Sequence, residues 1–241
     1  MKRIFFDVES LPPAKDAPCL PNPAIVARLC RQKCEQDATS QTDGEPANLD
    51  AMSDEHWGRL ALHAEYGRVL CIGVIIEIDG TPSRYGVLGF DSQQSVFHSD
   101  EERTLRQFWK LLEGFSLSRD LIIGHNVLDF DLPFIYNRSR INRVRPSVRL
   151  SLARYRQQPI YDTMREWANW NPRASLSLAH LAEVLRLNIG KSDDLDGSGI
   201  YHAFVTGQHQ AIADYCLQDV VVTRAAYYRL TQPDIDPPAL P

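Results

Sequence analysis

Runs of hydrophobic and β-branched residues, one short and one longer and almost uninterrupted, predict the β-strands of this chain. The first residues combine Ile, Phe and Val and lead into Leu11-Pro12-Pro13, which ends the run. A longer, almost uninterrupted apolar run is followed by Asp79-Gly80, a typical hairpin turn, and by a further β-prone run. The predicted strands are residues 2–9, 68–78, 84–90 and 120–124.

Apolar residues at helical spacing predict the remaining regular structure. A capping box at residues 99–102 opens a helix that carries Leu105, Phe108, Leu112 and Phe115 on one face. Three more helices are predicted at residues 128–140, 175–187 and 208–230. Because strands come first and then alternate with helices, the order predicts an α/β fold with a mixed central β-sheet flanked by helices.

Two segments stand apart from this pattern. Residues 12–65 are rich in polar side chains and Pro, so we interpret them as an insertion with one helix at about 23–36 rather than as a domain. The insertion leaves the first strand directly after Glu9, so we expect it to act as a lid or strand guide. Residues 231–241 are Pro-rich and predicted to be disordered, which leaves residues 1–230 as a single domain.

The composition is typical of a soluble globular protein. Of the 241 residues, 44% are hydrophobic and 24% charged, the net charge is −5, and no run is long enough for a signal peptide or membrane span. Five cysteines are too few and odd in number for a disulfide framework, so we expect a soluble protein of the reducing cytoplasm. The mild acidity excludes a uniformly basic surface but permits a local basic groove.

The first strand places two carboxylates together. Side chains alternate along a strand, so Asp7 and Glu9 share one face while Ile4, Phe6 and Val8 point into the core on the other. At a separation of about 4 Å and an effective dielectric of about 20, such a contact costs roughly 4 kcal/mol. The alternative interpretation is a solvated strand end.

A second acidic segment follows the strand at 120–124. Asp131 stands between Phe130, Leu132 and Phe134, where an unpaired charge is expensive, so it requires a cation or hydrogen-bond donors. We expect Asp129 to cap a helix N-terminus and His125 to close the turn through a backbone hydrogen bond.

A third segment lies in the last helix. Tyr215 and Asp219 are four residues apart, so they share a helix face and reach the same point. Alone, this pair is a weak signal and is usually a surface pair. Its significance comes from the order of the three segments.

Together the segments Asp7-Val8-Glu9, Asn126-x-x-x-Phe130-Asp131 and Tyr215-x-x-x-Asp219 resemble the motifs of the DEDD superfamily of 3′-5′ exonucleases. The chain is most similar to the exonuclease domain of family-B DNA polymerases and its stand-alone bacterial relatives. Asp214 stands where the other branch of the superfamily has His, so the resemblance is to the tyrosine branch.

This resemblance implies a ribonuclease H-like fold in which Asp7, Glu9, Asp131 and Asp219 hold two divalent ions. Four converging carboxylates require such positive charge, and oxygen ligands favour Mg²⁺ or Mn²⁺. No His or Cys cluster accompanies these residues in the sequence, which argues against zinc. Tyr215 ionises too rarely at neutral pH to act as a base, so we expect it to orient the attacking water.

Substrate contacts are predicted from nearby residues. The resemblance suggests that Asn126 and Phe130 meet the 3′-terminal nucleotide, whereas Phe6 faces the core. Lys191 and an arginine-rich stretch are candidates for phosphate contacts, with a solvated loop as the alternative for the arginines. The stretch contains Arg138, Arg140, Arg143, Arg145, Arg149, Arg154 and Arg156.

The expected function is metal-dependent hydrolysis of phosphodiester bonds at the 3′ end of single-stranded DNA, with release of nucleoside 5′-monophosphates. An exoribonuclease that trims RNA ends is the nearest alternative, because no residue indicates how the 2′-hydroxyl is treated. A catalytically silent nucleic-acid-binding module is the third, although no carboxylate is missing. The partner is a nucleic-acid 3′ end rather than a membrane, and no protein partner is predicted.

Overall fold

The computed structural model describes residues 1–14, 57–187 and 197–240, and its chain divides into two compact units. Unit 1 contains Met1–Glu9 and Val69–Pro241, and unit 2 contains Ser10–Arg68. The division falls close to the bounds of the polar insertion. The helix predicted at residues 23–36 lies outside the described residues.

A mixed five-stranded sheet forms the centre of unit 1, in the order β3-β2-β1-β6-β7. β2 and β3 form the predicted antiparallel hairpin, whereas β6 pairs in parallel with both β1 and β7. The strands are β1 (Lys2–Leu11), β2 (Arg68–Ile78), β3 (Thr81–Leu88), β6 (Leu121–Gly124) and β7 (Ile160–Asp162). A separate two-stranded hairpin consists of β4 (Phe90–Asp91) and β5 (Val96–Phe97).

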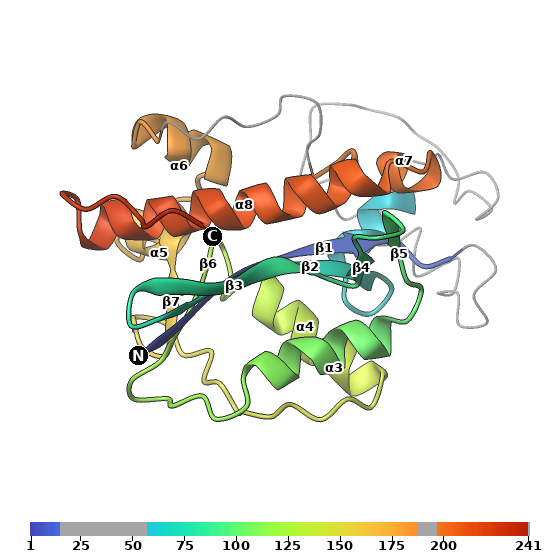
Figure 1. Ribbon diagram of the computed structural model, residues 1–241, viewed down its shortest axis with the longest axis horizontal. Helices are drawn as coiled ribbons and strands as arrows, with labels where there is room; N and C mark the ends of the chain where they lie inside the picture. The colour runs from blue at the N-terminus through green and yellow to red at the C-terminus, as the bar shows by residue number, and fades with distance from the viewer. Residues whose placement is uncertain (15–56, 188–196, 241) are drawn as a thin grey trace. The chain divides into compact units, whose positions relative to one another are not determined.

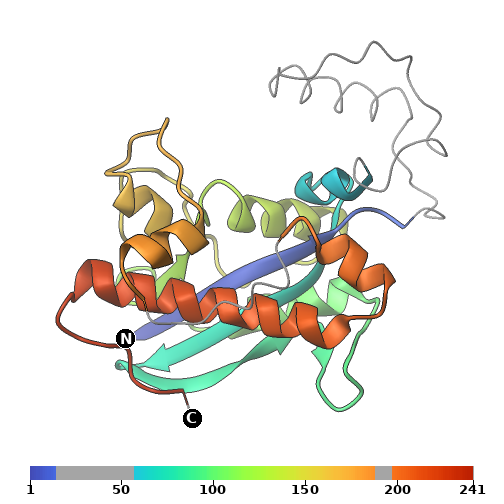
Figure 2. The ribbon, with the colours of Figure 1, turned by 90° about the horizontal axis from the view of Figure 1, so that it is seen from above.

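Helices cover both faces of this sheet. The long C-terminal helix α8 lies across one face, and α3 and α4 lie on the other (Figures 1 and 2). The helices are α3 (Glu101–Leu111), α4 (Asp131–Ile141), α5 (Thr163–Trp167), α6 (Leu178–Val184), α7 (Ile200–Val205) and α8 (His209–Thr231). None of those within the described ranges is long and apolar enough to cross a membrane. The predicted α/β class, with a mixed central sheet flanked by helices, is confirmed.

Alternation along β1 decides which side chains face which layer. Phe5 packs in a buried cluster with Ile75 and Tyr227, on the face covered by α8. Phe6 points the other way, with its ring 5.2 Å from that of Phe108 on α3, so the predicted core role of Phe6 is confirmed. Two residues after Phe5, Asp7 comes to the α8 face.

A buried ionic network holds α8 to the sheet. Glu77 on β2 is fully buried, and its carboxylate accepts hydrogen bonds from Arg224 Nε at 2.6 Å and Tyr228 Oη at 2.9 Å. Arg3 Nη1 on β1 lies 3.3 Å from the same carboxylate. Because every charge in this network has a partner, it fixes the position of α8 relative to β1 and β2.

The C-terminal residues make two contacts with the rest of unit 1. α8 extends to Thr231, and residues 232–240 form no further helix or strand. Arg224 Nη2 nevertheless donates to the carbonyl oxygen of Pro238 at 2.9 Å, and Leu240 packs against the cluster that contains Phe5. The tail is therefore held against unit 1 at these two residues.

Candidate active site

Two carboxylates from β1 form one wall of the candidate site. Asp7 and Glu9 lie on the α8 face of the strand, and Glu9 is buried, with 7% of its surface exposed. A carboxylate oxygen of each residue and the Sγ atom of Cys216 on α8 all lie within 4.8 Å of one another. β1 and α8 therefore meet at the point where the acidic pair projects.

Asp131 adds a third carboxylate from α4. It begins this helix and is 3% exposed, and its Oδ1 atom accepts a hydrogen bond from the Val8 backbone N–H at 3.1 Å. Burial raises its pKa well above the usual range, and the nearby charge of Asp7 raises it further. The acid that the flanking aromatic residues led us to expect in need of donors is thus buried beside β1 and has one donor in the Val8 N–H.

α8 contributes the fourth carboxylate and a tyrosine. Asp219 is buried, and Tyr215, one turn earlier, donates a hydrogen bond to it. The pKa of Tyr215 is raised above its ordinary value, first by burial and then by the charge of Asp219. The phenol is therefore protonated at neutral pH and is a hydrogen-bond donor rather than a base.

Glu9 lies at the centre of this acidic group. Its pKa is raised well above the usual range, chiefly because it is buried and next because Asp7 is close. Asp219 and Asp131 act on it in the same direction. The structure thus brings together the four carboxylates and Tyr215 predicted from three distant segments.

Asp162 positions the turn that leads into α4. Its carboxylate accepts backbone hydrogen bonds from Asn126 and Leu128 in that turn, both at 3.0 Å. It also accepts them from Met164 and Arg165 in the first turn of α5, at 3.0 and 3.2 Å. One buried side chain therefore links two segments and determines where Asp131 begins its helix.

The neighbouring His125 has a related structural role. Its Nε2 atom donates to the Leu176 carbonyl at 2.8 Å, and its Nδ1 atom lies 2.9 Å from Thr163 Oγ1. Nε2 thus bonds to backbone, as predicted, but in a distant segment rather than in its own turn. Asn126, which follows, has a φ of 60°, a conformation that Asn tolerates.

The expected helix cap at Asp129 is wrong. The residue that caps α4 is Phe130, whose side chain makes no capping hydrogen bond. Asp129 instead forms ion pairs with Arg154, at 2.5 Å, and with Arg165, whose Nε lies 2.8 Å from the carboxylate. These arginines are remote in sequence, so local helix chemistry could not indicate them.

The predicted substrate-binding residues differ in their exposure and in the partners that they have within the fold. Arg138 donates to both carboxylate oxygens of Glu101, at 2.8 and 2.7 Å, and only 11% of its side chain is exposed. Its guanidinium therefore stabilises the contact between α3 and α4, which argues against the predicted phosphate role. Arg140 is exposed and donates to Asn137. The ring of Phe130, just before Asp131, is partly exposed, and Lys191 lies outside the described residues.

Two thiols beside the carboxylates were missed by sequence reasoning. Cys71 on β2 and Cys216 on α8 are fully buried and hydrogen-bonded to each other. Cys71 also lies close enough to Glu9 to raise its pKa. No His or Cys cluster was expected beside the carboxylates from the sequence, whereas the fold places Cys216 next to Asp7 and Glu9. The alternation of β2 places Cys71 on the same face as Ile75, which is the one signal that could have predicted it.

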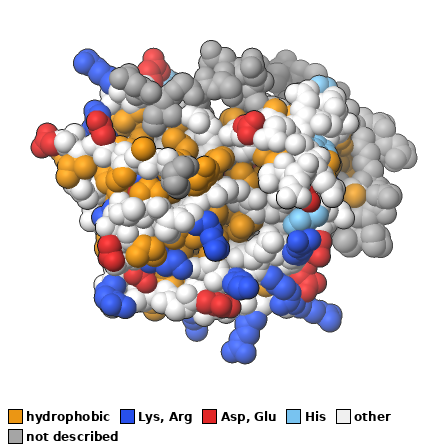
Figure 3. Space-filling model, viewed as in Figure 1, with side chains coloured by type: hydrophobic (Ala, Val, Ile, Leu, Met, Phe, Trp, Pro, Cys, Tyr) orange, Lys and Arg blue, Asp and Glu red, His pale blue; other side chains and the backbone are white. Residues whose placement is uncertain are grey.

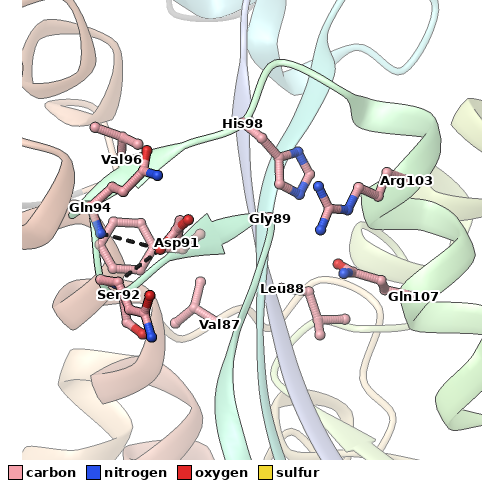
Figure 4. A pocket seen from close by; sticks show the side chains of 12 residues that line it. Val87, Leu88, Gly89, Asp91, Ser92, Gln94, Val96, His98, Arg103 and Gln107 are labelled. Carbon is pink, nitrogen blue, oxygen red and sulfur yellow. Dashed lines mark hydrogen bonds between the residues drawn. The ribbon is translucent and has the colours of Figure 1, made fainter.

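A cavity of about 620 Å³ lies away from the acidic residues, between α3 and the β4–β5 hairpin (Figure 4). His98, Arg103 and Gln107 line one side of it. Within the described residues, the buried atoms His98 Nδ1 and Gln107 Oε1 have no hydrogen-bond partner. Basic and acidic side chains alternate on the surface over α3 (Figure 3). The cavity is therefore lined by both polar and apolar side chains, and it contains none of the four carboxylates.

The same hairpin contacts the start of α8. Ser95 Oγ lies 3.2 Å from Gln210 Oε1, and the ring of Phe97 lies 5.4 Å from that of His209. Tyr215 follows Gln210 by five residues, or about 7.5 Å along the helix axis. The hairpin that borders the cavity and the acidic site thus contact the same helix.

Comparison with known families identifies the chain. A family model described as a predicted 3′-5′ exonuclease related to the exonuclease domain of PolB matches residues 62–234, more than half of the sequence. The chain belongs to this family. The matched part of the chain contains Asp131, Tyr215 and Asp219, whereas Asp7 and Glu9 precede it. No curated protein matches the chain.

Solved structures support the same fold. The chain is similar to a family B DNA polymerase from the hyperthermophilic archaeon Pyrobaculum calidifontis, with a TM-score of 0.54 and 16% sequence identity. The match covers 95% of this chain but only 24% of the polymerase. This likeness extends to the fold alone.

Proposed function

We propose that this chain removes nucleotides one at a time from the 3′ end of single-stranded DNA and releases nucleoside 5′-monophosphates. The observation that carries the proposal is the convergence of Asp7, Glu9, Asp131 and Asp219 from three segments remote in sequence. Membership of a family of predicted 3′-5′ exonucleases supports the direction of the reaction.

The donor set fits two divalent cations. Burial and mutual repulsion raise the pKa values of Glu9 and Asp131, so a bound cation would favour their ionised forms. Carboxylate oxygens are the ligands that Mg²⁺ and Mn²⁺ prefer, and all four carboxylates would hold these ions. When bound, such a pair stabilises the attacking and leaving oxygens of a phosphodiester displacement.

Tyr215 would orient the attacking water. Its raised pKa keeps the phenol protonated, and its hydrogen bond to Asp219 directs the hydroxyl towards the acidic site. Asn126 and the partly exposed ring of Phe130 precede Asp131 in the chain and would contact the terminal nucleotide.

A labelled-strand assay tests the proposed function. We expect the purified protein to shorten a 5′-labelled DNA strand stepwise in Mg²⁺ or Mn²⁺, and to stop when EDTA removes the ion. A matched RNA strand and a DNA strand with a blocked 3′-phosphate end serve as comparisons. A ladder from RNA alone would identify an exoribonuclease, and strand binding without products in either ion would identify a silent binding module.

Tyr215→Phe separates a water-orienting tyrosine from a catalytic base. We expect kcat to fall by about 10- to 100-fold, because one hydrogen bond to the attacking water is lost. The pH dependence of kcat should keep its shape, since the phenol stays protonated over the working range. Kinetics from acid to alkaline pH would check this, and loss of an alkaline limb in the variant would contradict it.

Arg103 is the residue of the cavity best suited to bind a phosphate of the strand. Arg103→Ala should raise KM several-fold with little change in kcat, and reduce the salt slope of binding by about 0.7. Arg106→Ala is the matched control, because Arg106 lies on the same helix but pairs with Glu102. Equal effects of the two variants on the salt slope would exclude a specific phosphate contact.

A further inference from the structure

The two buried thiols change the chemistry of the acidic site. Cys216 Sγ lies within 4.8 Å of carboxylate oxygens of both Asp7 and Glu9. Cys71 is hydrogen-bonded to Cys216 and lies close to Glu9. One sulfur atom and two carboxylates therefore lie together where β1 and α8 meet, and the Cys71 thiol on β2 lies next to this sulfur atom. Sulfur ligands select for different metals than carboxylates do.

The spacing suits a tetrahedral ion. Zinc binds cysteine sulfur at about 2.3 Å and carboxylate oxygen at about 2.0–2.2 Å, which places neighbouring ligand atoms about 3.4–3.8 Å apart. The observed upper limit of 4.8 Å therefore requires each ligand to move by an ångström or less. Such movement is within reach of a Glu or Asp side chain by rotation alone.

The backbone of Gly73 lies directly against the sulfur atom of Cys216. The N–H of Gly73 on β2 points at Sγ, with a nitrogen–sulfur distance of 3.1 Å. The hydrogen bond to Cys71 and burial raise the pKa of the free Cys216 thiol well above its usual range, so a thiolate forms here only with a bound cation, and the Gly73 N–H would remain a donor to it. A Cβ at position 73 would lie 3.0 Å from this sulfur, so the approach requires glycine.

We propose that Asp7, Glu9 and Cys216, assisted by Cys71, bind one thiophilic divalent cation such as Zn²⁺ or Cd²⁺. The ion replaces the thiol proton of Cys216, which passes to solvent, and forms a metal–sulfur bond without any change in oxidation state. Such a site binds Zn²⁺ more tightly than it binds Mn²⁺. Because the ion takes Asp7 and Glu9, it competes with Mg²⁺ and Mn²⁺ and inhibits the exonuclease. This inhibition rests on the proposed function, whereas the binding does not.

Cadmium absorption measures the binding directly. Cd²⁺ bound to thiolate gives a ligand-to-metal charge-transfer band in the ultraviolet, which carboxylates alone do not produce. Cys19, Cys30 and Cys34 lie outside the described residues and would also bind Cd²⁺, so all three are first replaced by Ser. We expect the resulting full chain, reduced and metal-free, to develop the band with one Cd²⁺ per molecule. Absence of the band would overturn the proposal.

Two further variants locate the ion. In this background Cys216→Ser should remove the band, and Asp7→Asn, which leaves both thiols in place, should weaken Cd²⁺ binding at least 10-fold. Circular dichroism confirms that each variant is folded, and Asp7→Asn provides the test if Cys216→Ser does not fold. A band unchanged in either folded variant would contradict the proposed ligands.

Inhibition is then tested separately from binding. In Mn²⁺, submicromolar Zn²⁺ should inhibit strand degradation by the background protein, and at least 10-fold more Zn²⁺ should be needed after Cys216→Ser. A cadmium band in a protein without nuclease activity would refute the proposed function and leave the metal site intact. Nuclease activity with equal Zn²⁺ sensitivity in both proteins would refute the thiol site and leave the proposed function intact.

Discussion

Glu9→Gln should abolish strand degradation and at the same time stabilise the metal-free protein. Glu9 is buried among Asp7, Asp131 and Asp219, so its carboxylate is a central part of the proposed cation site. The neutral amide retains the size of the side chain but is a weaker ligand. We expect kcat to fall at least about 10³-fold, which corresponds to roughly 4 kcal/mol of lost transition-state stabilisation.

The stabilisation follows from the raised pKa of Glu9. The folded, metal-free protein binds this proton more tightly than the unfolded chain, in which Glu ionises near its ordinary pKa. The contribution of Glu9 to the free energy of unfolding is therefore greatest below the unfolded pKa. It declines as the pH rises through the higher, folded pKa. Glutamine does not ionise, so its contribution to the free energy of unfolding does not decline with pH. The variant therefore becomes more stable relative to the wild type as the pH rises.

Thermal unfolding in EDTA at about pH 5 and about pH 8 measures this difference. The melting temperature of the variant should exceed that of the wild type by more at the higher pH. Each kcal/mol corresponds to about 2–4 °C in a domain of this size. Glu113→Gln is the matched control, because Glu113 is exposed. A difference that is the same at both pH values would contradict the raised pKa.

Gly73→Ala should lower kcat about 100-fold without changing any residue of the acidic site. A Cβ at position 73 would lie 2.9 Å from the Cys216 carbonyl oxygen and 2.9 Å from Val220 Cγ2. These atoms belong to α8, so the helix must shift away from β2 and carry Tyr215 and Asp219 with it. A misplacement of about 1 Å at reacting groups is sufficient for such a loss, and the overpacking costs about 1–3 kcal/mol of stability.

Ile75→Val distinguishes displacement from simple destabilisation. Ile75 is buried on the same strand and face, and the smaller side chain costs about 0.5–1.5 kcal/mol without adding an atom. Steady-state kinetics and thermal unfolding of both variants provide the comparison. If Ile75→Val lost as much activity as Gly73→Ala, stability rather than the position of α8 would explain the effect.

Local patterns predicted the long elements and the acidic residues. The bounds predicted for residues 68–78 match β2, because that strand is apolar on both faces and ends at a hairpin turn. β7 was missed because its three residues, 160–162, are too few to show a period. The resemblance of the three acidic segments to exonuclease motifs selected the four carboxylates and Tyr215, and each motif could be found because it is local in sequence.

Interactions between distant segments could not be predicted in this way. Arg138 was assigned to phosphate binding from its place in an arginine-rich stretch, but Glu101 from another helix engages it. Asp129 was assigned to a cap, but Arg154 and Arg165 reach it through the fold. Cys71 and Cys216 are 145 positions apart by their numbers, and only the packing of α8 on β2 brings their sulfur atoms together.

The four backbone hydrogen bonds that Asp162 accepts make position 162 intolerant of substitution. No substitution at this position reproduces an acceptor for all four amides, since even asparagine exchanges one of the accepting oxygens for a donor. A library screened for activity would therefore recover almost only the parental residue at position 162. Such intolerance would resemble that of a catalytic group. The carboxylate is nevertheless fully enclosed, and its role is to join two backbone segments by hydrogen bonds.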